Sequence, residues 1–276
     1  MKAFVFSIFL CLLMEQVSAQ QPINVMSYNI RFDNPGDSVN AWPNRKDWVK
    51  DLVDYYDTDI LCIQEALVGQ VNDLVQGSRF AMEGVGRDDG RKKGEYTAIL
   101  YNKSRFRKTN SGTFWLSDTP EKPSKGWDAQ ILRICTWLKL EDRLTKKEFY
   151  VFNTHFDHIG VEAREKSAIL IKEKITQISG NAAVILTGDL NTKPDTKPIT
   201  VLKSFLKDTK EVSKAKPYGP EGTFNAFKFD AELKDRIDYI FVNGKVEVLK
   251  YAALSDSKNQ RYPSDHLPVL VKFSLR

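Results

Sequence analysis

Short apolar runs recur along almost the whole chain, and they restrict its fold more than any other feature. They are rich in valine, isoleucine, leucine and aromatic residues, and polar turns or amphipathic stretches separate them, which is typical of β-strands. We predict strands at residues 23–28, 59–64, 95–101, 106–116, 131–140, 148–154, 183–188, 236–242, 246–254 and 267–273.

Two amphipathic stretches, residues 44–56 and 162–178, have the apolar spacing of helices. Residues 117–130 and 214–222 have the composition of long loops, which are often functional in a compact domain. Because helices and strands interleave without strict alternation, we expect two packed sheets with helices outside. With 276 residues, 42% of them hydrophobic, the chain suffices for one sizeable core, so we expect a single domain over residues 20–276.

The N-terminus has the pattern of a secretory signal peptide. Lys2 precedes an apolar run at residues 3–14, and small residues at Ser18 and Ala19 fit a cleavage site. The run is shorter than the roughly 20 residues that span a bilayer, although an uncleaved anchor is the rival interpretation. We expect residues 1–19 to be removed and the rest to be exported, periplasmic or extracellular, without stable membrane insertion.

Two cysteines remain after that cleavage. Cys62 and Cys135 lie in apolar runs, which predicts two buried thiols. A single disulfide in an oxidising compartment is the alternative, and spacing alone does not decide between them.

Polar side chains of four types follow or interrupt the predicted strands. Each alone is compatible with a turn or a cap, but a strand end also holds a side chain rigidly at a cleft. The set is Asn29, Glu65, His155, Asp157, Asp189, Asn191, Asp238, Asp265 and His266. Because all are Asp, Asn, Glu or His, together they point to one site.

The motifs around these residues occur in the order of a known superfamily. They are Ser-Tyr-Asn29-Ile-Arg, Ile-Gln-Glu65, Asn-Thr-His155-Phe-Asp157-His, Thr-Gly-Asp189-Leu-Asn191, Arg-Ile-Asp238-Tyr-Ile-Phe and Ser-Asp265-His266-Leu-Pro-Val. This resembles the endonuclease/exonuclease/phosphatase superfamily, which includes deoxyribonuclease I, over residues 23–273, and looks like a bacterial exported branch. The resemblance implies a four-layer α/β (α+β) sandwich of two mixed β-sheets flanked by helices, and a metal-dependent phosphoester hydrolase.

The resemblance also implies a role for each residue. Glu65, Asn29 and Asp265 would hold Mg²⁺ or Mn²⁺, which prefer hard oxygen ligands. Asp189 would activate the attacking water, and Asn191 would hold that water or a phosphate oxygen. His266 would donate to a non-bridging oxygen, with Asp238 holding its ring.

His155 would stabilise the leaving oxygen, with Glu95 as its partner, as in the corresponding strand of deoxyribonuclease I. Arg133 is a candidate phosphate contact or a strand-edge surface residue. Asp157 is a further candidate for substrate binding, whereas His158 is expected to be solvent-exposed or structural.

The substrate is less constrained. Residues 87–93 form either a basic patch or a solvated turn, and the net charge of +5 is too mild to identify a nucleic-acid-binding protein. Trp115 and Trp127 could stack on a base or sugar, or pack as core. We therefore expect a monomer that hydrolyses a small phosphomonoester or phosphodiester.

Two alternatives stay open. One is an exported nuclease acting on DNA or RNA, and the other is a non-catalytic binding module with the same fold. Hydrolysis of a non-phosphate bond lacks the zinc spacing or Ser-His-Asp arrangement that it would need.

Overall fold

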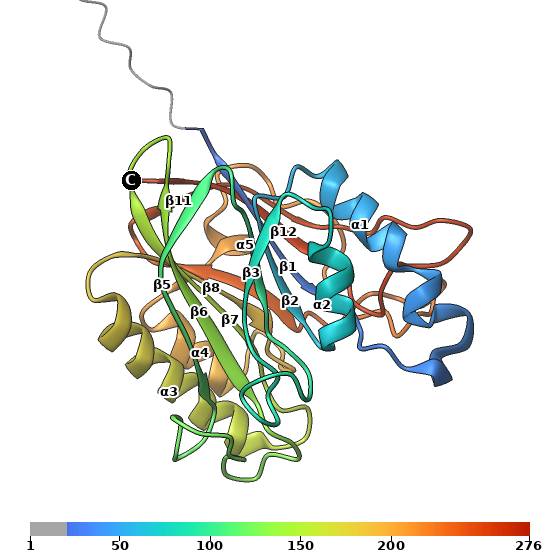
Figure 1. Cartoon of the computed structure of the whole chain (residues 1–276), viewed down its shortest axis with the longest axis horizontal. Helices are drawn as coiled ribbons and strands as arrows, with labels where there is room; N and C mark the ends of the chain where they lie inside the picture. The colour runs from blue at the N-terminus through green and yellow to red at the C-terminus, as the bar shows by residue number, and fades with distance from the viewer. Residues whose placement is uncertain (1–20) are drawn as a thin grey trace, which may run out of the picture.

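The computed structural model describes residues 21–276, so the expected signal peptide at residues 1–19 lies outside the described residues. Two six-stranded sheets face each other, and helices cover their outer faces (Figure 1). This arrangement confirms the predicted four-layer sandwich.

The first sheet has the strand order β11-β12-β1-β2-β4-β3. Its strands are β1 (Ile23–Asn29), β2 (Ile60–Gln64), β3 (Phe80–Glu83), β4 (Ile99–Asn102), β11 (Val246–Ala253) and β12 (Val269–Leu275). β1 runs parallel to β2 and antiparallel to β12, so the sheet is mixed. The helices α1 (Lys46–Tyr55) and α2 (Val68–Val75) pack on its outer face.

The second sheet has the strand order β5-β6-β7-β8-β10-β9. Its strands are β5 (Phe106–Trp115), β6 (Ile134–Asp142), β7 (Glu148–His155), β8 (Ala183–Asp189), β9 (Lys207–Asp208) and β10 (Asp238–Val242). α3 (Val161–Ser179) joins the parallel pair β7 and β8 and covers the outer face together with α4 (Lys197–Lys203). The remaining short helices are η1 (Pro35–Asn40), η2 (Trp42–Asn44) and α5 (Thr209–Val212).

Alternate residues of the strands point between the sheets and form the central core. Val25, Ile185 and Val271 are fully buried there, and two further clusters lie under the helices. Because apolar residues line both faces of the inner strands, these strands are nearly continuous apolar runs in the sequence.

Some elements differ from the prediction. The strand expected at residues 95–101 pairs regularly only over Ile99–Asn102, because Tyr96 forms an isolated bridge with Ala66 and the Glu95 carbonyl accepts from the Arg87 amide. α2 and β3 were not predicted, since both are short. Within residues 21–276, the structure contains no helix that is long and apolar enough to cross a membrane.

Both described cysteines are free and fully buried, which confirms the prediction of two buried thiols. They belong to different layers: Cys62 lies in the central core, and Cys135 lies in the cluster under α3.

Candidate active site

The predicted site residues meet because strands of both sheets end at the same edge of the sandwich. In the parallel pair β1 and β2, Asn29 is in register with Gln64, and Glu65 follows directly. In the parallel pair β7 and β8, His155 is in register with Asp189. Parallel strands present their carboxyl ends at one edge, so side chains far apart in the sequence converge there.

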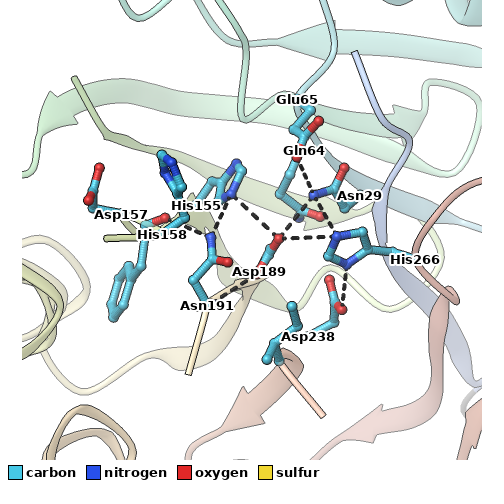
Figure 2. Close-up of polar contacts among 12 residues, drawn as sticks. Asn29, Gln64, Glu65, His155, Asp157, His158, Asp189, Asn191, Asp238 and His266 are labelled. Atoms are coloured by element: carbon cyan, nitrogen blue, oxygen red, sulfur yellow. Dashed lines mark hydrogen bonds and ion pairs between the residues drawn. The ribbon is translucent and has the colours of Figure 1, made fainter. Parts of the chain in front are cut away.

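Asn29 connects the two sheets at this edge. Its side-chain nitrogen donates to Glu65 Oε1 and to Asp189 Oδ2, each at 2.9 Å (Figure 2). Glu65 and Asp189 therefore face the same space, which is the arrangement that a shared cation and an activated water require.

His266 and Asp238 form a second, buried pair. His266 Nδ1 lies 2.9 Å from Asp238 Oδ2, and the Thr223 hydroxyl donates to the same oxygen at 2.6 Å. Burial opposes the charged ring, but the carboxylates of Asp238 and Asp189 raise the pKa of His266 well above its ordinary value. These carboxylates therefore favour the charged form of His266, whose Nε2 lies 3.7 Å from Asp189 Oδ2.

The surroundings of His155 act in the opposite direction and favour the neutral ring. Burial and the neighbouring Arg133 and Arg87 charges lower the pKa of His155 well below its ordinary value. Its Nε2 lies 3.0 Å from Asn191 Nδ2 and 3.4 Å from Asp189 Oδ2. The two imidazoles thus lie on either side of one carboxylate (Figure 2), and their surroundings shift their pKa values in opposite directions.

Asp189 is almost fully buried between these rings. Burial, and then the charge of Asp238, raises the pKa of Asp189 to about 7. Its other oxygen, Oδ1, accepts from the Asn191 backbone amide at 2.9 Å, which fixes the carboxylate plane.

Three residues of the site have left-handed backbone conformations, with φ of 56° at Arg31, 64° at Glu65 and 48° at Asn191. Such conformations are costly for residues other than glycine and concentrate at functional sites. The Arg31 backbone N–H donates to Asn29 Oδ1. In the same way, the Asn191 backbone N–H donates to Asp189 Oδ1, two residues earlier. The turns therefore hold the functional side chains in place.

An acidic and histidine cluster of the site could hold a metal ion. Ligand atoms of Glu65, His155 and Asp189 lie within 4.8 Å of one another, as do those of Asp189, Asp238 and His266. Burial raises the pKa of Asp265, and the charge of nearby Glu65 adds to this effect. Carboxylate oxygens around a site of excess negative charge fit a hard divalent cation.

A pocket of about 410 Å³ opens above this cluster. Besides predicted residues, its lining includes Arg31, Phe32, His158 and Phe224. His158, which we expected to be solvent-exposed or structural, is exposed and lies at the pocket wall.

Arg133 is only 5% exposed and lines the pocket, so the alternative of a surface arginine is wrong. Its Nη2 lies 3.1 Å from His158 Nδ1, and its Nε lies 3.6 Å from Asp157 Oδ2. Asp157 itself does not line the pocket: it accepts from the backbone amides of Ile131, Ile159 and Gly160 and thereby shapes the loop.

Three expectations need correction. Glu95 lines the pocket but pairs with Arg87, at 2.5 Å, and no hydrogen bond joins it to His155 among the described residues. The Trp115 indole is buried and donates to the Arg87 carbonyl oxygen. Trp127 donates to Asp118 and lines a separate hollow beside α3. Neither tryptophan lines the pocket, because the Trp115 indole is held by the loop of Arg87 and the Trp127 indole by its own loop.

Sequence reasoning missed Arg31, Arg87, His158 and Thr223 as contributors to the site. Arg31 lies inside a quoted motif and His158 ends another, so both had a signal. Arg87 and Thr223 reach the site through loop conformations, for which the sequence offers no local pattern.

The Endonuclease/Exonuclease/phosphatase family matches residues 26–266, and the chain belongs to this family. An uncharacterised protein of Acanthamoeba polyphaga mimivirus is 32% identical over 167 residues, which is 56% of this chain. The chain's match spans 61% of that protein and 42% of a second mimivirus relative.

Solved structures agree with this assignment. A mannosyl-6-phosphatase of Bacteroides thetaiotaomicron is 39% identical, with a TM-score of 0.88 over 92% of this chain and 100% of that one. The human nocturnin catalytic domain is 21% identical, with a TM-score of 0.74 over 92% and 94% of the two chains, and supports the fold alone.

Proposed function

We propose that this chain is a divalent-metal-dependent phosphoester hydrolase that acts on small phosphomonoesters, with a phosphorylated sugar as the favoured substrate class. The observation that carries the proposal is the Asn29 bridge, which joins Glu65 of one sheet to Asp189 of the other beside His266. A binding module would not need a cation site, a buried carboxylate and two imidazoles in one pocket.

Glu65 and Asn29 would hold the cation, Mg²⁺ or Mn²⁺, with Asp265 acting directly or through water. When bound, the cation offsets the negative charge that builds on the phosphate during the reaction. The left-handed turn at Glu65 and the Phe32 amide, which donates to Glu65 Oε2 at 3.2 Å, keep the carboxylate aimed into the pocket.

Asp189 would orient the attacking water and accept its proton. Its plane is fixed by the Asn29 side chain and the Asn191 backbone, so little reorganisation is needed during the reaction. Attack in line with the leaving oxygen requires no covalent enzyme intermediate, and position and electrostatics supply most of the catalysis.

The two histidines would act on different oxygens. His266, held by Asp238, would donate to a non-bridging oxygen of the phosphate. His155, with Asn191 beside it, would donate to the leaving oxygen. Arg133 and His158 stand at the pocket wall and would contact the transferred phosphate or its substituent.

Two observations favour a small monoester over a nucleic acid. In the basic loop 87–93, Arg87 pairs with Glu95 and is thereby held away from a bound polymer, and Asp89 accepts from the backbone amides of Arg91 and Lys93, which shapes the loop as a turn. In addition, the solved relative at 39% identity is described as a mannosyl-6-phosphatase. Neither observation favours a polymeric substrate.

The test uses chain 20–276 with 4-nitrophenyl phosphate, mannose 6-phosphate, bis(4-nitrophenyl) phosphate and plasmid DNA as substrates. We expect hydrolysis of the monoesters with Mg²⁺ or Mn²⁺, loss of activity in EDTA, and loss of at least about 10²-fold in Asp189→Asn. Activity that survives EDTA would contradict the metal role. Faster cleavage of plasmid than of either monoester would favour the nuclease, and binding without turnover of any substrate would favour the binding module.

We further propose that the chain is exported, on the basis of the sequence of residues 1–19. We also propose that it acts as a monomer. Mass spectrometry of the protein from its host should give a chain beginning at Gln20, and light scattering should give the mass of one chain. Retention of residues 1–19 would favour the uncleaved anchor.

A further inference from the structure

A second groove, of about 540 Å³, lies on the outer face of the first sheet, away from the candidate active site. Asn24 at its edge lies five residues before Asn29 on β1, a separation of roughly 17 Å along the strand. Its side chains point outward, whereas those of Ile23 and Val25 point into the central core. Nothing in the proposed hydrolysis uses this groove.

The groove has two walls of different origin. One wall is the end of α1, with Tyr55 and Tyr56. The other is the loop from Lys214 to Tyr218, which hydrogen-bonds along the edge of β11 through backbone contacts such as Ala253 N to Tyr218 O at 3.0 Å. At Gly219, where φ is +94°, a Cβ would collide with the Ala253 carbonyl, so glycine is required for this close approach.

Two lysines stand opposite each other on the groove floor. A bulge in β11 between Val248 and Lys250 shifts the register, and Lys250 pairs with Lys272 of β12. The bulge turns Lys250 to the outer face, since Val248 before it faces the core. Like charges directly opposite on neighbouring strands are destabilising.

No ion pair among the described residues relieves this repulsion. Within residues 21–276, neither of these lysines nor Lys216 at the groove wall forms an ion pair. Three unpaired ammonium groups around one groove therefore favour the binding of an anionic group of a ligand.

The aromatic side chains of the groove are exposed to an unusual degree. Tyr218 is 76% exposed and Tyr55 is 79% exposed, in a protein whose large apolar side chains are mostly buried. Tyr56, between them, is fixed by its hydroxyl hydrogen bond to Asp256 Oδ2 at 3.0 Å. The Tyr55 ring meets the Tyr56 ring edge to face, with 5.2 Å between the centroids. Exposed rings such as those of Tyr55 and Tyr218 are suited to stacking on sugar or base faces.

We propose that this groove binds a saccharide chain that carries isolated acidic groups, such as a phosphorylated glycan. Tyr218 and Tyr55 would stack on sugar rings, and Lys250 and Lys272 would pair with the acidic substituent. The Asp57 carboxylate and Asn24 Oδ1 in the lining offer acceptors for sugar hydroxyls, whereas Asn24 Nδ2 already donates to the carbonyls of Tyr56 and Asp57. The same acidic groups, Asp57 and nearby Asp256, would repel a nucleic acid with one phosphate per unit, so a sparsely charged ligand fits better.

The experiment measures binding by calorimetry in the Asp189→Asn background, so that the probe is not hydrolysed. The probes are a mannose oligosaccharide with one phosphate, its neutral counterpart and a single-stranded DNA oligonucleotide. We expect the phosphorylated saccharide to bind most tightly. Adding Lys250→Gln with Lys272→Gln, or Tyr218→Ala, should raise its Kd about tenfold or more.

The matched control is Lys122→Gln with Lys125→Gln, an equal charge change in the exposed loop 117–130, which should leave the Kd within twofold. Because Lys250→Gln removes a repulsion, it should also raise the Tm of the ligand-free protein by about 1–3 °C. A Kd unchanged by the groove variants, or tighter binding of DNA, would overturn the proposal. Failure of the unmodified chain to hydrolyse 4-nitrophenyl phosphate would refute the proposed function alone and leave this measurement standing.

Discussion

The two sheets supply the candidate pocket with opposite chemistries. Loops that follow or precede first-sheet strands bring oxygen ligands, chiefly Glu65, whose backbone is left-handed, and Asp265. The second sheet brings nitrogen groups, chiefly His155 and Arg133. The difference indicates a division of labour, in which one half receives a cation and the other receives an anionic substrate.

His266, which precedes β12 of the first sheet, departs from this division as a nitrogen group, and Asp189 joins the two halves. Asp189 ends a second-sheet strand, yet its Oδ2 accepts from Asn29 of the first sheet and lies near both histidines. A carboxylate where the two sheets meet can act on a water between the cation and the phosphate. Variants that separate metal binding from turnover therefore test whether the two sheets have different roles.

The largest effects on turnover should come from Asp189, which joins the two sheets, and from Glu65 of the first sheet. Glu65→Gln and Asp189→Asn should each lower kcat/KM by at least about 10²-fold, since each removes a preorganised charge. A Mg²⁺ titration distinguishes them: excess Mg²⁺ should restore part of the rate in Glu65→Gln and none in Asp189→Asn. Equal rescue of both variants would contradict the division between cation binding and water activation.

Arg133 variants test whether the second sheet contributes to substrate binding. Arg133→Met removes a charge aimed at the substrate, so KM should rise about 10- to 100-fold, the scale of a lost hydrogen bond to a charged group. Arg133→Lys should have a smaller effect. The Mg²⁺ concentration for half-maximal rate should stay unchanged in both variants, and a shift in it would mean that the halves are not separate.

Thr223 should have a smaller effect, as a positioning residue. Thr223→Val removes the hydroxyl that donates to Asp238 Oδ2, so His266 loses part of its orientation and kcat should fall about five- to tenfold. KM should change little. Thr223→Ser keeps the hydroxyl and should restore kcat. If Thr223 only filled space, Thr223→Val would instead keep the higher kcat.

Asp157 should affect stability rather than turnover. Burial opposes its charge, but backbone N–H groups of residues such as Gly160 and Ile131 lower the pKa of Asp157 to about 2. A lowered folded-state pKa stabilises the protein above pH 3.8, and this contribution is lost as the pH falls through about 2. Asp157→Asn should thus cost about 1–2 kcal/mol at pH 7 and almost nothing near pH 2, as measured by urea unfolding.

The sequence predicted those parts of the site that backbone geometry determines directly. Asn29, Glu65, His155 and Asp189 each follow an apolar strand, and parallel pairing of such strands forces their ends together. The two-sheet sandwich followed from the same runs, because strands buried on both faces are apolar throughout.

The errors lie where a loop conformation decides the contact. Glu95 was assigned to His155, but the turn through Gly90 and Gly94, both with positive φ, returns Arg87 to it instead. Trp115 donates its indole N–H to that same turn. Neither pairing leaves a periodic pattern, so no reading of apolar spacing could have found them.

The two thiols offer a consequence for experiments on folding. Burial raises the pKa of Cys62 to about 12 and also raises that of Cys135, so neither is available to alkylating reagents in the native protein. Cys62 becomes reactive only when the sheets part, and Cys135 only when α3 lifts. Residues 21–276 thus carry two native label sites, and the order in which they react shows which interface of the sandwich opens first.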